Sequence, residues 1–417
     1  MKIGIVTDWF EGGSGYVARQ YLRHFKARGE VCVYARGNGF RAAGDPEWEL
    51  PEVTWGRSSV LPLATAIDLR DFDQWLEANR PDTVFFIEQR HWDPVILCRD
   101  KGIKTGSYVD YYTEDTVPLF GLFDFLICNT RRHHQAFDWH EQCHYVPWGT
   151  EVDVFTANSF EPVNAECLIF FESIGKSPHR KGTDLLLEAF ARVRGEARLV
   201  LHAQVDLASQ LPRQRELIGR LEGEGRLRII SRSEGAPGLY HLGDVYVYPS
   251  RLDGIGLSMA EALACGLPLI VPDCPPMTEF VDRERAISAS VALKRTFARR
   301  DGYYWPQCEV DTGALAATME DYIERFDRIA ELKAKARAFA LEHLDWSDRE
   351  GAVWEAVANS ERRGGQDKEL LAAEAERVQE MQGGIPYRLY RKSPTLYAAA
   401  RKLARGLGVA DDTERSY

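Results

Sequence analysis

The sequence lacks the paired or regularly spaced cysteines of a metal ribbon or a disulfide framework. Its eight cysteines are scattered over 417 residues without a C-x-x-C pair, which is the pattern expected of reduced thiols. An excess of positive charge is also missing, because 52 basic residues face 63 acidic ones and the formal net charge is −11. Nucleic-acid backbones are bound by clustered lysines and arginines, so a general nucleic-acid binder is excluded.

Long apolar runs are missing as well. The most apolar stretch, 257–272, contains Glu261 and falls short of the roughly 20 apolar residues that a membrane span requires. The first residues reach Thr7-Asp8 without the apolar region of a signal peptide. We therefore expect a cytoplasmic protein.

The sequence does contain enough apolar residues to bury two cores. Apolar residues make up 45% of the chain and charged residues 28%, as in globular proteins, and the length suits two domains. In each half, short apolar runs alternate with helix-like stretches. This alternation predicts an α/β chain with two doubly wound parallel sheets, each covered by helices on both faces.

The alternation also predicts where the elements lie. The expected strands of the first half are 3–6, 31–35, 84–87, 105–109 and 125–128, with helices at 16–28 and 72–79. Those of the second half are 167–171, 199–202, 227–230, 245–248 and 269–271, followed by helical patterns at 312–343.

Turn residues at 150–164 indicate a hinge between the halves. The expected domains are therefore 1–157 and 158–345. A helix at 346–363, with Ser347 as its N-cap, is expected to return toward the first domain. Residues 364–417 form a helical, partly basic C-terminal extension that follows Gly364-Gly365.

The most specific segment, 249–268, reads P-S-R-L-D-G-I-G-L-S-M-A-E-A-L-A-C-G-L-P. It follows a predicted strand, turns through two glycines and enters a helix. Free N–H groups and the positive dipole at a helix start attract a diphosphate. Asp253 lies in the loop and Glu261 about one turn into the helix, so both can accept hydrogen bonds from sugar and ribose hydroxyls.

This segment resembles the hallmark of glycosyltransferase family four, E-G-F-G-L-x-x-x-E-A followed by a small residue, glycine and proline. The glycines, the leucine, the second acid and the trailing G-x-P coincide, whereas Asp253 shortens the first acid by a methylene. The resemblance covers about residues 1–360. It assigns donor binding here to Asp253, Gly254, Ile255, Gly256, Leu257, Ser258 and Glu261.

The resemblance implies the GT-B fold, with two Rossmann-like domains facing across a cleft. It further implies a retaining transfer from a UDP- or GDP-linked sugar to a hydroxyl acceptor. No D-x-D metal motif stands at the end of a predicted strand, so we expect a transfer without a metal or another cofactor. The acceptor is a glycan, a lipid-linked sugar or a small molecule. Two alternatives stay open: a GT-B nucleotide-sugar epimerase or phosphorylase, and a catalytically weak sugar-binding protein.

A second match is the loop 175–182, where the family has G-R, four residues and K-G. Lys181 fits the second cation, and Lys176 replaces the arginine. Fixed cations stabilise the negative charge that develops on a departing diphosphate, although lysine lacks the bidentate fork of arginine. By topology, the segment 229–234 with Arg232 is expected near the nucleobase.

In the first half, the family has a glycine-rich loop beside the donor phosphate and the acceptor, which corresponds here to Gly12, Gly13 and Gly15. The predicted strand 105–109 ends in Asp110, where much of the family has a histidine that contacts the donor sugar. Asp110 either takes over that contact or caps a helix. With Lys176, Lys181 and Asp253, it completes the candidate catalytic residues.

Four histidines cluster near Cys143, namely His133, His134, His140 and His144. Residues 140–144 read H-E-Q-C-H, which has the spacing of an H-E-x-x-H motif. No acid-rich second shell accompanies the cluster, so packed or surface histidines are favoured over a metal site.

The tail 386–408 carries six cations without an acid, and Leu396, Ala400, Leu403 and Leu407 recur in it at helical spacing. Three interpretations are open for this tail. It lies on an anionic membrane at the inner face, packs on the first domain, or mediates self-association.

Overall fold

The computed structural model describes residues 1–38, 41–281, 285, 287–363 and 368–406. The predicted joint at Gly364-Gly365 and residues 407–417 lie outside these ranges. The chain divides into two compact units. The first unit contains 1–129, 133–146 and the chain from 350 onward, and the second contains 130–132 and 147–349.

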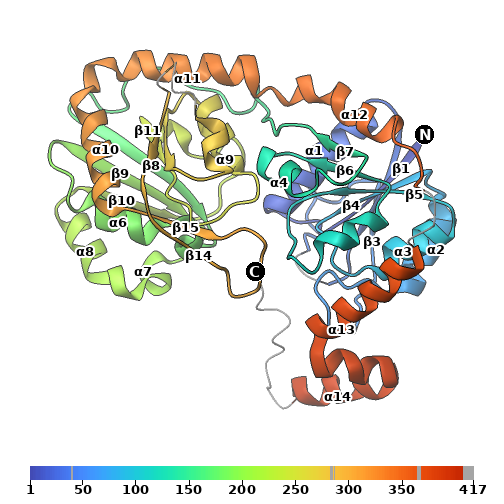
Figure 1. Ribbon diagram of the computed structural model, residues 1–417. Coiled ribbons are helices and arrows are strands. Elements are labelled where there is room, and N and C mark those ends of the chain that lie inside the picture. Colours follow the sequence, from blue (N-terminus) through green and yellow to red (C-terminus); the bar gives the residue numbers. More distant parts are fainter. Residues whose placement is uncertain (39–40, 282–284, 286, 364–367, 407–417) are drawn as a thin grey trace. The chain divides into compact units, whose positions relative to one another are not determined.

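The first unit contains a seven-stranded parallel sheet in the order β3-β2-β1-β4-β5-β6-β7 (Figure 1). Its strands are β1 (Lys2–Thr7), β2 (Glu30–Ala35), β3 (Val53–Trp55), β4 (Thr83–Ile87), β5 (Lys104–Tyr108), β6 (Phe125–Cys128) and β7 (Cys143–Tyr145). The sequence predicted all of these except the edge strands β3 and β7, which are too short to show a period. The strand order reverses between β1 and β4, which makes this the topological switch point of the sheet.

The helices of the first unit are α1 (Gly13–Lys26), α2 (Leu69–Asn79), α3 (Asp93–Asp100), η1 (Val117–Leu122), α12 (Glu350–Ala358), α13 (Lys368–Lys392) and α14 (Pro394–Gly406), and α4 (Arg131–Ala136) spans the boundary between the units. Asp68 caps α2 by accepting hydrogen bonds from the N–H groups of Arg70 and Asp71. α13 bends at Gly384, where φ is 55°.

The expected N-cap at Ser347 is wrong. Ser347 lies inside the 3₁₀ turn η6 (Trp346–Arg349) of the second unit. Its backbone N–H and hydroxyl both donate to Asp345 Oδ1, at 2.9 and 2.7 Å. Asp345 therefore makes the capping contacts, because its carboxylate accepts both donors.

The second unit contains a six-stranded parallel sheet in the order β10-β9-β8-β11-β12-β13. Its strands are β8 (Leu168–Gly175), β9 (Ala197–Ala203), β10 (Leu227–Ser231), β11 (Val245–Val247), β12 (Leu269–Pro272) and β13 (Ser288–Val291), and β14 (Leu293–Phe297) pairs antiparallel with β15 (Gln307–Val310). The sequence missed β13, β14 and β15, because their polar residues interrupt any apolar run. This strand order reverses between β8 and β11.

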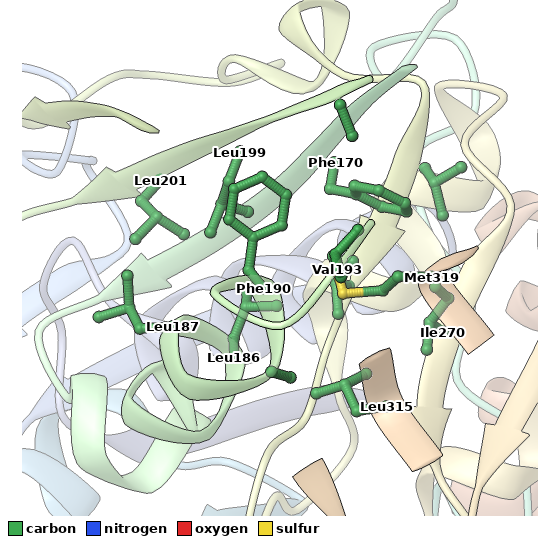
Figure 2. Close-up of a cluster of buried hydrophobic side chains, with 14 of the residues drawn as sticks. Phe170, Leu186, Leu187, Phe190, Val193, Leu199, Leu201, Ile270, Leu315 and Met319 are labelled. Carbon is green, nitrogen blue, oxygen red and sulfur yellow. The ribbon is translucent and has the colours of Figure 1, made fainter. Parts of the chain in front are cut away.

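The helical elements of this unit are α5 (Pro178–Lys181), α6 (Thr183–Phe190), α7 (Leu207–Gln210), η2 (Pro212–Gln214), α8 (Arg215–Gly223), η3 (Tyr240–Leu242), α9 (Leu257–Ala264), η4 (Met277–Phe280), α10 (Thr312–Glu324), η5 (Phe326–Arg328) and α11 (Ile329–His343). Alternate residues of β8 supply two cores. Phe170 packs with Phe190 and Met319 on one face (Figure 2), and Phe171 packs with Met259 on the other. This alternation follows from the two-residue period of a strand.

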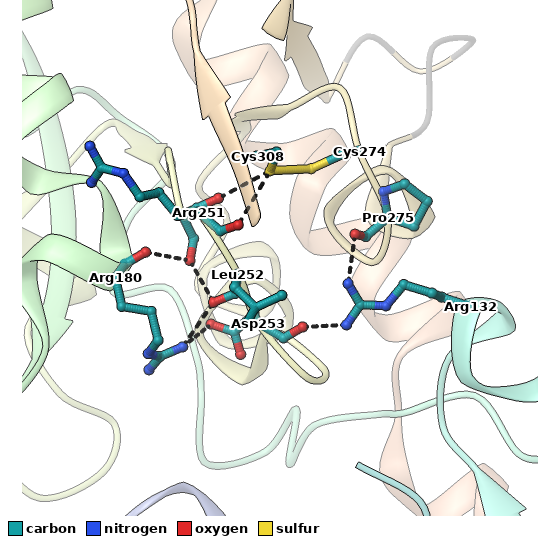
Figure 3. Close-up of a disulfide and its surroundings, with 9 residues drawn as sticks. Arg132, Arg180, Arg251, Leu252, Asp253, Cys274, Pro275 and Cys308 are labelled. Carbon is teal, nitrogen blue, oxygen red and sulfur yellow. Dashed lines mark hydrogen bonds and ion pairs between the residues drawn. A yellow bond between two sulfur atoms is a disulfide. The ribbon is translucent and has the colours of Figure 1, made fainter. Parts of the chain in front are cut away.

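Cys274 and Cys308 form a disulfide (Figure 3), although the sequence predicted only free thiols. The two cysteines are 34 residues apart and follow no spacing pattern. They meet because β12 and β15 lie side by side, which is a tertiary contact. None of the described helices is both long and apolar enough to cross a bilayer.

Candidate functional site

Two loops of the second unit leave the carboxyl ends of β8 and β11, where the strand order reverses. The first loop runs from Lys176 through α5 to Gly182. The second runs through Asp253 into α9. Open α/β sheets bind ligands in the crevice outside the carboxyl ends of such neighbouring strands.

The two loops are joined by close contacts. Gly182 has a φ of 76°, and a Cβ at this position would meet the carbonyl oxygen of Pro249 at 2.1 Å, so only glycine fits. The backbone N–H of Arg251 donates to the carbonyl of Arg180 at 2.8 Å. The guanidinium of Arg251 also binds both carboxylate oxygens of Asp184, at 2.7 and 2.8 Å. The loops therefore behave as one rigid platform.

Lys181 and Asp253 meet on this platform. Lys181 Nζ lies 2.7 Å from Asp253 Oδ2, and Arg180 Nη1 lies 3.0 Å from the same oxygen (Figure 3). The hydroxyl of Tyr248 donates to Asp253 and accepts from Lys181. Burial raises the pKa of Asp253, but the charges of Lys181 and Arg180 outweigh it and hold that pKa well below its usual range. Asp253 is therefore a carboxylate at neutral pH.

Glu261 is the fifth residue of α9. Its Oε2 accepts a hydrogen bond from the hydroxyl of Tyr240 at 2.5 Å. Burial raises the pKa of Glu261, while Tyr240 and the charge of Lys181 act in the opposite direction. Lys181 thus acts electrostatically on both acids of the motif. Lys181, Asp253 and Glu261 are half-buried, which leaves them accessible to a ligand.

The start of α9 provides the positive end of a helix dipole at the same edge. Gly256 precedes the helix with a φ of 84°, a conformation that favours glycine. The N–H of Gly254 donates to Asp253 Oδ1 at 3.1 Å. Ile255 is buried, whereas Leu257 and Ser258 are half-buried.

The other two predicted donor residues of this unit, Lys176 and Arg232, are more exposed than Lys181, Asp253 and Glu261. Lys176 is exposed at the carboxyl end of β8. Arg232 is exposed after β10, and its guanidinium pairs with Glu234. β10 is two strands from β8, so the sheet does not bring Arg232 to the group around Lys181.

Sequence reasoning missed four residues of the site, namely Arg180, Tyr240, Tyr248 and Arg251. Arg180 lies in the basic loop, directly before Lys181, which the sequence did single out. In the sequence, the two tyrosines look like ordinary strand or core residues. Only the three-dimensional arrangement shows that their hydroxyls bind Asp253 and Glu261.

In the first unit, Asp8, Glu88 and Asp110 follow the neighbouring strands β1, β4 and β5. Arg36 Nε lies 2.8 Å from Asp8 Oδ1 in a buried ion pair. Glu88 has a φ of 54°, a left-handed conformation that costs a non-glycine residue roughly 1 kcal/mol or more. Burial raises the pKa of Glu88 to about 8, with a further increase from Asp110 and Asp8.

Asp110 does not cap a helix, which corrects one of the two interpretations. The next helical turn, η1, begins only at Val117. Asp110 Oδ1 instead lies 3.9 Å from His133 Nε2, and Nδ1 of His133 is hydrogen-bonded to the hydroxyl of Tyr112 at 2.8 Å. Asp110 therefore belongs to the polar group at the carboxyl edge of the first sheet.

The glycines of the β1–α1 turn also lie in the first unit. A Cβ on Gly15 would meet the carbonyl oxygen of Phe10 at 1.9 Å, and one on Gly12 would meet the ring of Phe10 at 2.2 Å. Packing on Phe10 therefore explains both. Gly13 has no other described atom within 4 Å of an added Cβ.

Comparisons with known proteins show what this chain is similar to. Residues 167–300, which include both loops, match the family model of glycosyl transferases group 1. The solved structure of HepE from Anabaena in complex with UDP matches with a TM-score of 0.68 and 14% identity, over 86% of this chain and 100% of that chain. The fold is GT-B.

Two curated relatives of this GT-B chain are mannosyltransferases. The lipopolysaccharide core biosynthesis mannosyltransferase LpsB of Rhizobium meliloti is 24% identical over 253 residues, which cover 56% of this chain and 64% of that protein. A GDP-mannose-dependent monoacylated phosphatidylinositol monomannoside mannosyltransferase of Corynebacterium glutamicum is 24% identical over 323 residues, which cover 64% of this chain and 79% of that protein.

Two histidines of the predicted cluster, His140 and His144, make hydrogen bonds to other groups of the protein. His140 Nε2 lies 3.1 Å from the carbonyl oxygen of Phe123, and His144 Nε2 lies 3.0 Å from the hydroxyl of Ser360. Burial lowers the pKa of both imidazoles. In the part of the chain that the structure describes, no three histidine, cysteine or acidic residues are grouped as metal ligands.

Proposed function

We propose that the chain is a glycosyltransferase that moves a sugar from a nucleotide-diphosphate sugar to a hydroxyl acceptor with retention of configuration. The observation that carries this proposal is the group formed by Lys181, Arg180 and Asp253 at the switch point of the second sheet. The group lies within the region that matches the group 1 family model.

The platform has a separate partner for each part of a donor. Lys181 and the N-terminus of α9 bind the diphosphate, because fixed positive charge and N–H groups favour an anion. Asp253 accepts hydrogen bonds from hydroxyls of the sugar. Glu261 accepts them from the ribose, and Lys176 at the outer edge contributes further positive charge.

The transfer breaks the bond between the anomeric carbon and the diphosphate oxygen. The acceptor hydroxyl attacks from the same face, and its proton passes to an oxygen of the leaving diphosphate. Lys181 stabilises the charge that develops on that diphosphate, so the proposed step requires no metal. Asp253 is a poor nucleophile, because Lys181, Arg180 and Tyr248 already bind its carboxylate.

We assign the acceptor to the carboxyl edge of the first sheet. Glu88 and Asp110 present carboxyl oxygens there, and Asp110 acts on the donor sugar or the acceptor hydroxyl. Mannose is the sugar named for both curated relatives, and their acceptors support a glycan or a lipid-linked sugar. The base is tested as either uracil or guanine, since HepE is bound to UDP and the corynebacterial relative depends on GDP-mannose.

The test begins with a panel of UDP- and GDP-sugars, scored by the increase in melting temperature that a bound donor causes. The stabilising donor is then incubated with glycan and lipid-linked acceptors, and release of nucleoside diphosphate and the anomeric configuration of the product are measured. Glu261→Ala is expected to weaken donor binding and abolish transfer. Unchanged turnover in this variant, or a changed nucleotide sugar formed from donor alone, would contradict the proposal.

A further inference from the structure

The C-terminal helices of the first unit carry an exposed apolar face. Ile385 and Leu389 of α13 are 72% and 54% exposed, and Leu396 and Leu403 of α14 are 72% and 68% exposed. Residues four or seven apart share one face of a helix, and the two helices contact each other (Figure 1). We call Ile385, Leu389, Leu396 and Leu403 the C-terminal apolar face.

The segment that carries this face contains only positive charges. Residues 381–406 contain cations and no acid. Arg388 and Arg391 pair with Glu380 and Glu376 of the earlier part of α13, at 2.7 and 2.6 Å. Lys392 and Lys402 are exposed. The far end of the helical pair is therefore positively charged as well as apolar.

This end of the chain is anchored on the first unit. The carboxamide oxygen of Gln379 accepts a hydrogen bond from the N–H of Trp92 at 2.9 Å. The ring of Tyr387 is buried against Leu61, Leu63 and Ala66. The C-terminal apolar face is thus held in a defined place rather than on a loose tail.

The segment 61–66, against which Tyr387 packs, is hydrogen-bonded to the carboxyl edge of the first sheet. Thr65 Oγ1 accepts from the N–H of Arg90 at 2.7 Å, and the carbonyl of Thr65 accepts from the side chain of Gln89 at 3.2 Å. Gln89 and Arg90 follow Glu88 at the end of β4. A surface that binds the C-terminal helices would therefore lie close to the proposed acceptor edge.

We propose that the C-terminal apolar face docks on an anionic lipid bilayer, with α14 lying in the plane of the interface. Apolar side chains enter the boundary between headgroups and acyl chains, and lysines bind anionic headgroups. α14 has 13 residues and is about 20 Å long at 1.5 Å per residue, too short to span a bilayer. A second copy of the chain fits less well, because two such faces would bring like charges together.

Vesicle flotation tests this proposal with the full chain. Phosphatidylglycerol–phosphatidylcholine vesicles should carry the wild-type chain, and phosphatidylcholine vesicles should bind it much more weakly. Leu396→Glu combined with Leu403→Glu should lower the partition coefficient at least tenfold. Leu370→Glu is the matched control, because Leu370 is 73% exposed at the other end of α13, and binding should be unchanged.

The lysines give a second prediction. Lys392→Gln and Lys402→Gln should each weaken binding about fivefold, which corresponds to ~1 kcal/mol per cation near an anionic surface, and added salt should abolish this difference.

Three outcomes would overturn the proposal: no flotation of the wild-type chain, equal flotation of the double leucine variant and the Leu370→Glu control, or a dimer in sedimentation that the double leucine variant alone disrupts. The assay contains no sugar donor, so its failure is separate from a failure of the proposed function.

Discussion

Replacing Lys181 by methionine tests whether the platform of the second unit binds a diphosphate. The substitution keeps an apolar stem of similar length and removes the ammonium group that contacts Asp253 and Tyr248. It should weaken binding of the nucleoside diphosphate that the panel identifies, because the site then loses the cation that we assign to the diphosphate.

The magnitude follows from the contacts. A hydrogen bond to a charged group is worth about 1.5–3 kcal/mol, so the dissociation constant should increase roughly 10- to 100-fold. The folded state should lose about 1.5–3 kcal/mol, as for one hydrogen bond to a charged group, because Arg180 and Tyr248 still bind the carboxylate of Asp253.

A second buried lysine of the same unit provides a matched control. Lys333 Nζ lies 3.1 Å from Asp244 Oδ1, and both side chains are almost fully buried. Asp244 immediately precedes β11, so this pair lies at the amino edge of the sheet, away from the proposed site. Lys333→Met should cost about 3–5 kcal/mol of stability, because it leaves a buried carboxylate without its cation.

Isothermal titration of folded Lys181→Met and Lys333→Met, at a temperature where both are folded, separates binding from stability. The account predicts weak binding in the first variant and wild-type affinity in the second. Equal dissociation constants for Lys181→Met and the wild type would refute the assignment of the diphosphate to this lysine.

Two further predictions concern the platform and the first unit. Arg251→Met should lower the free energy of unfolding, measured by urea denaturation, by about 3–5 kcal/mol, because it leaves the carboxylate of Asp184 without its guanidinium. The Asp184→Leu, Arg251→Met double variant should recover most of that loss. Equal stability of the two variants would contradict the bidentate pair. The pKa of Glu88 is raised to about 8 in the folded protein, so Glu88 keeps a proton there that it loses near pH 4.5 in the unfolded chain. The free energy of unfolding should therefore decrease as the pH rises from about 4.5 to about 8. Glu88→Gln should flatten this part of the melting-temperature profile, and parallel profiles for variant and wild type would count against the shift.

Much of the fold could be predicted because it depends on local patterns. The central strands β1, β4 and β8 are nearly continuous apolar runs, as expected for strands buried on both faces. The segment from Asp253 to Glu261 could be proposed as a donor site because its glycines, acids and helix start are adjacent in the sequence. The structure then places Asp253 and Lys181 together, as a shared site requires.

The remaining features depend on contacts between distant residues. Three-residue strands such as β3 exist only through their neighbours. Arg180 binds the carboxylate of Asp253 together with Lys181, because both residues lie at the end of the short helix α5, next to the loop that follows β11. The pairing of Cys274 with Cys308 and the hydroxyl contacts of Tyr240 and Tyr248 likewise follow from tertiary packing, which no sequence period encodes.

The most direct test of the central claim is a crystal structure of the chain with the nucleoside diphosphate that stabilises it. The account predicts that diphosphate oxygens lie within hydrogen-bond distance of Lys181 Nζ and of the first N–H groups of α9, with the ribose beside Glu261. A nucleotide bound elsewhere, with Lys181 still paired only to Asp253 and Tyr248, would contradict it.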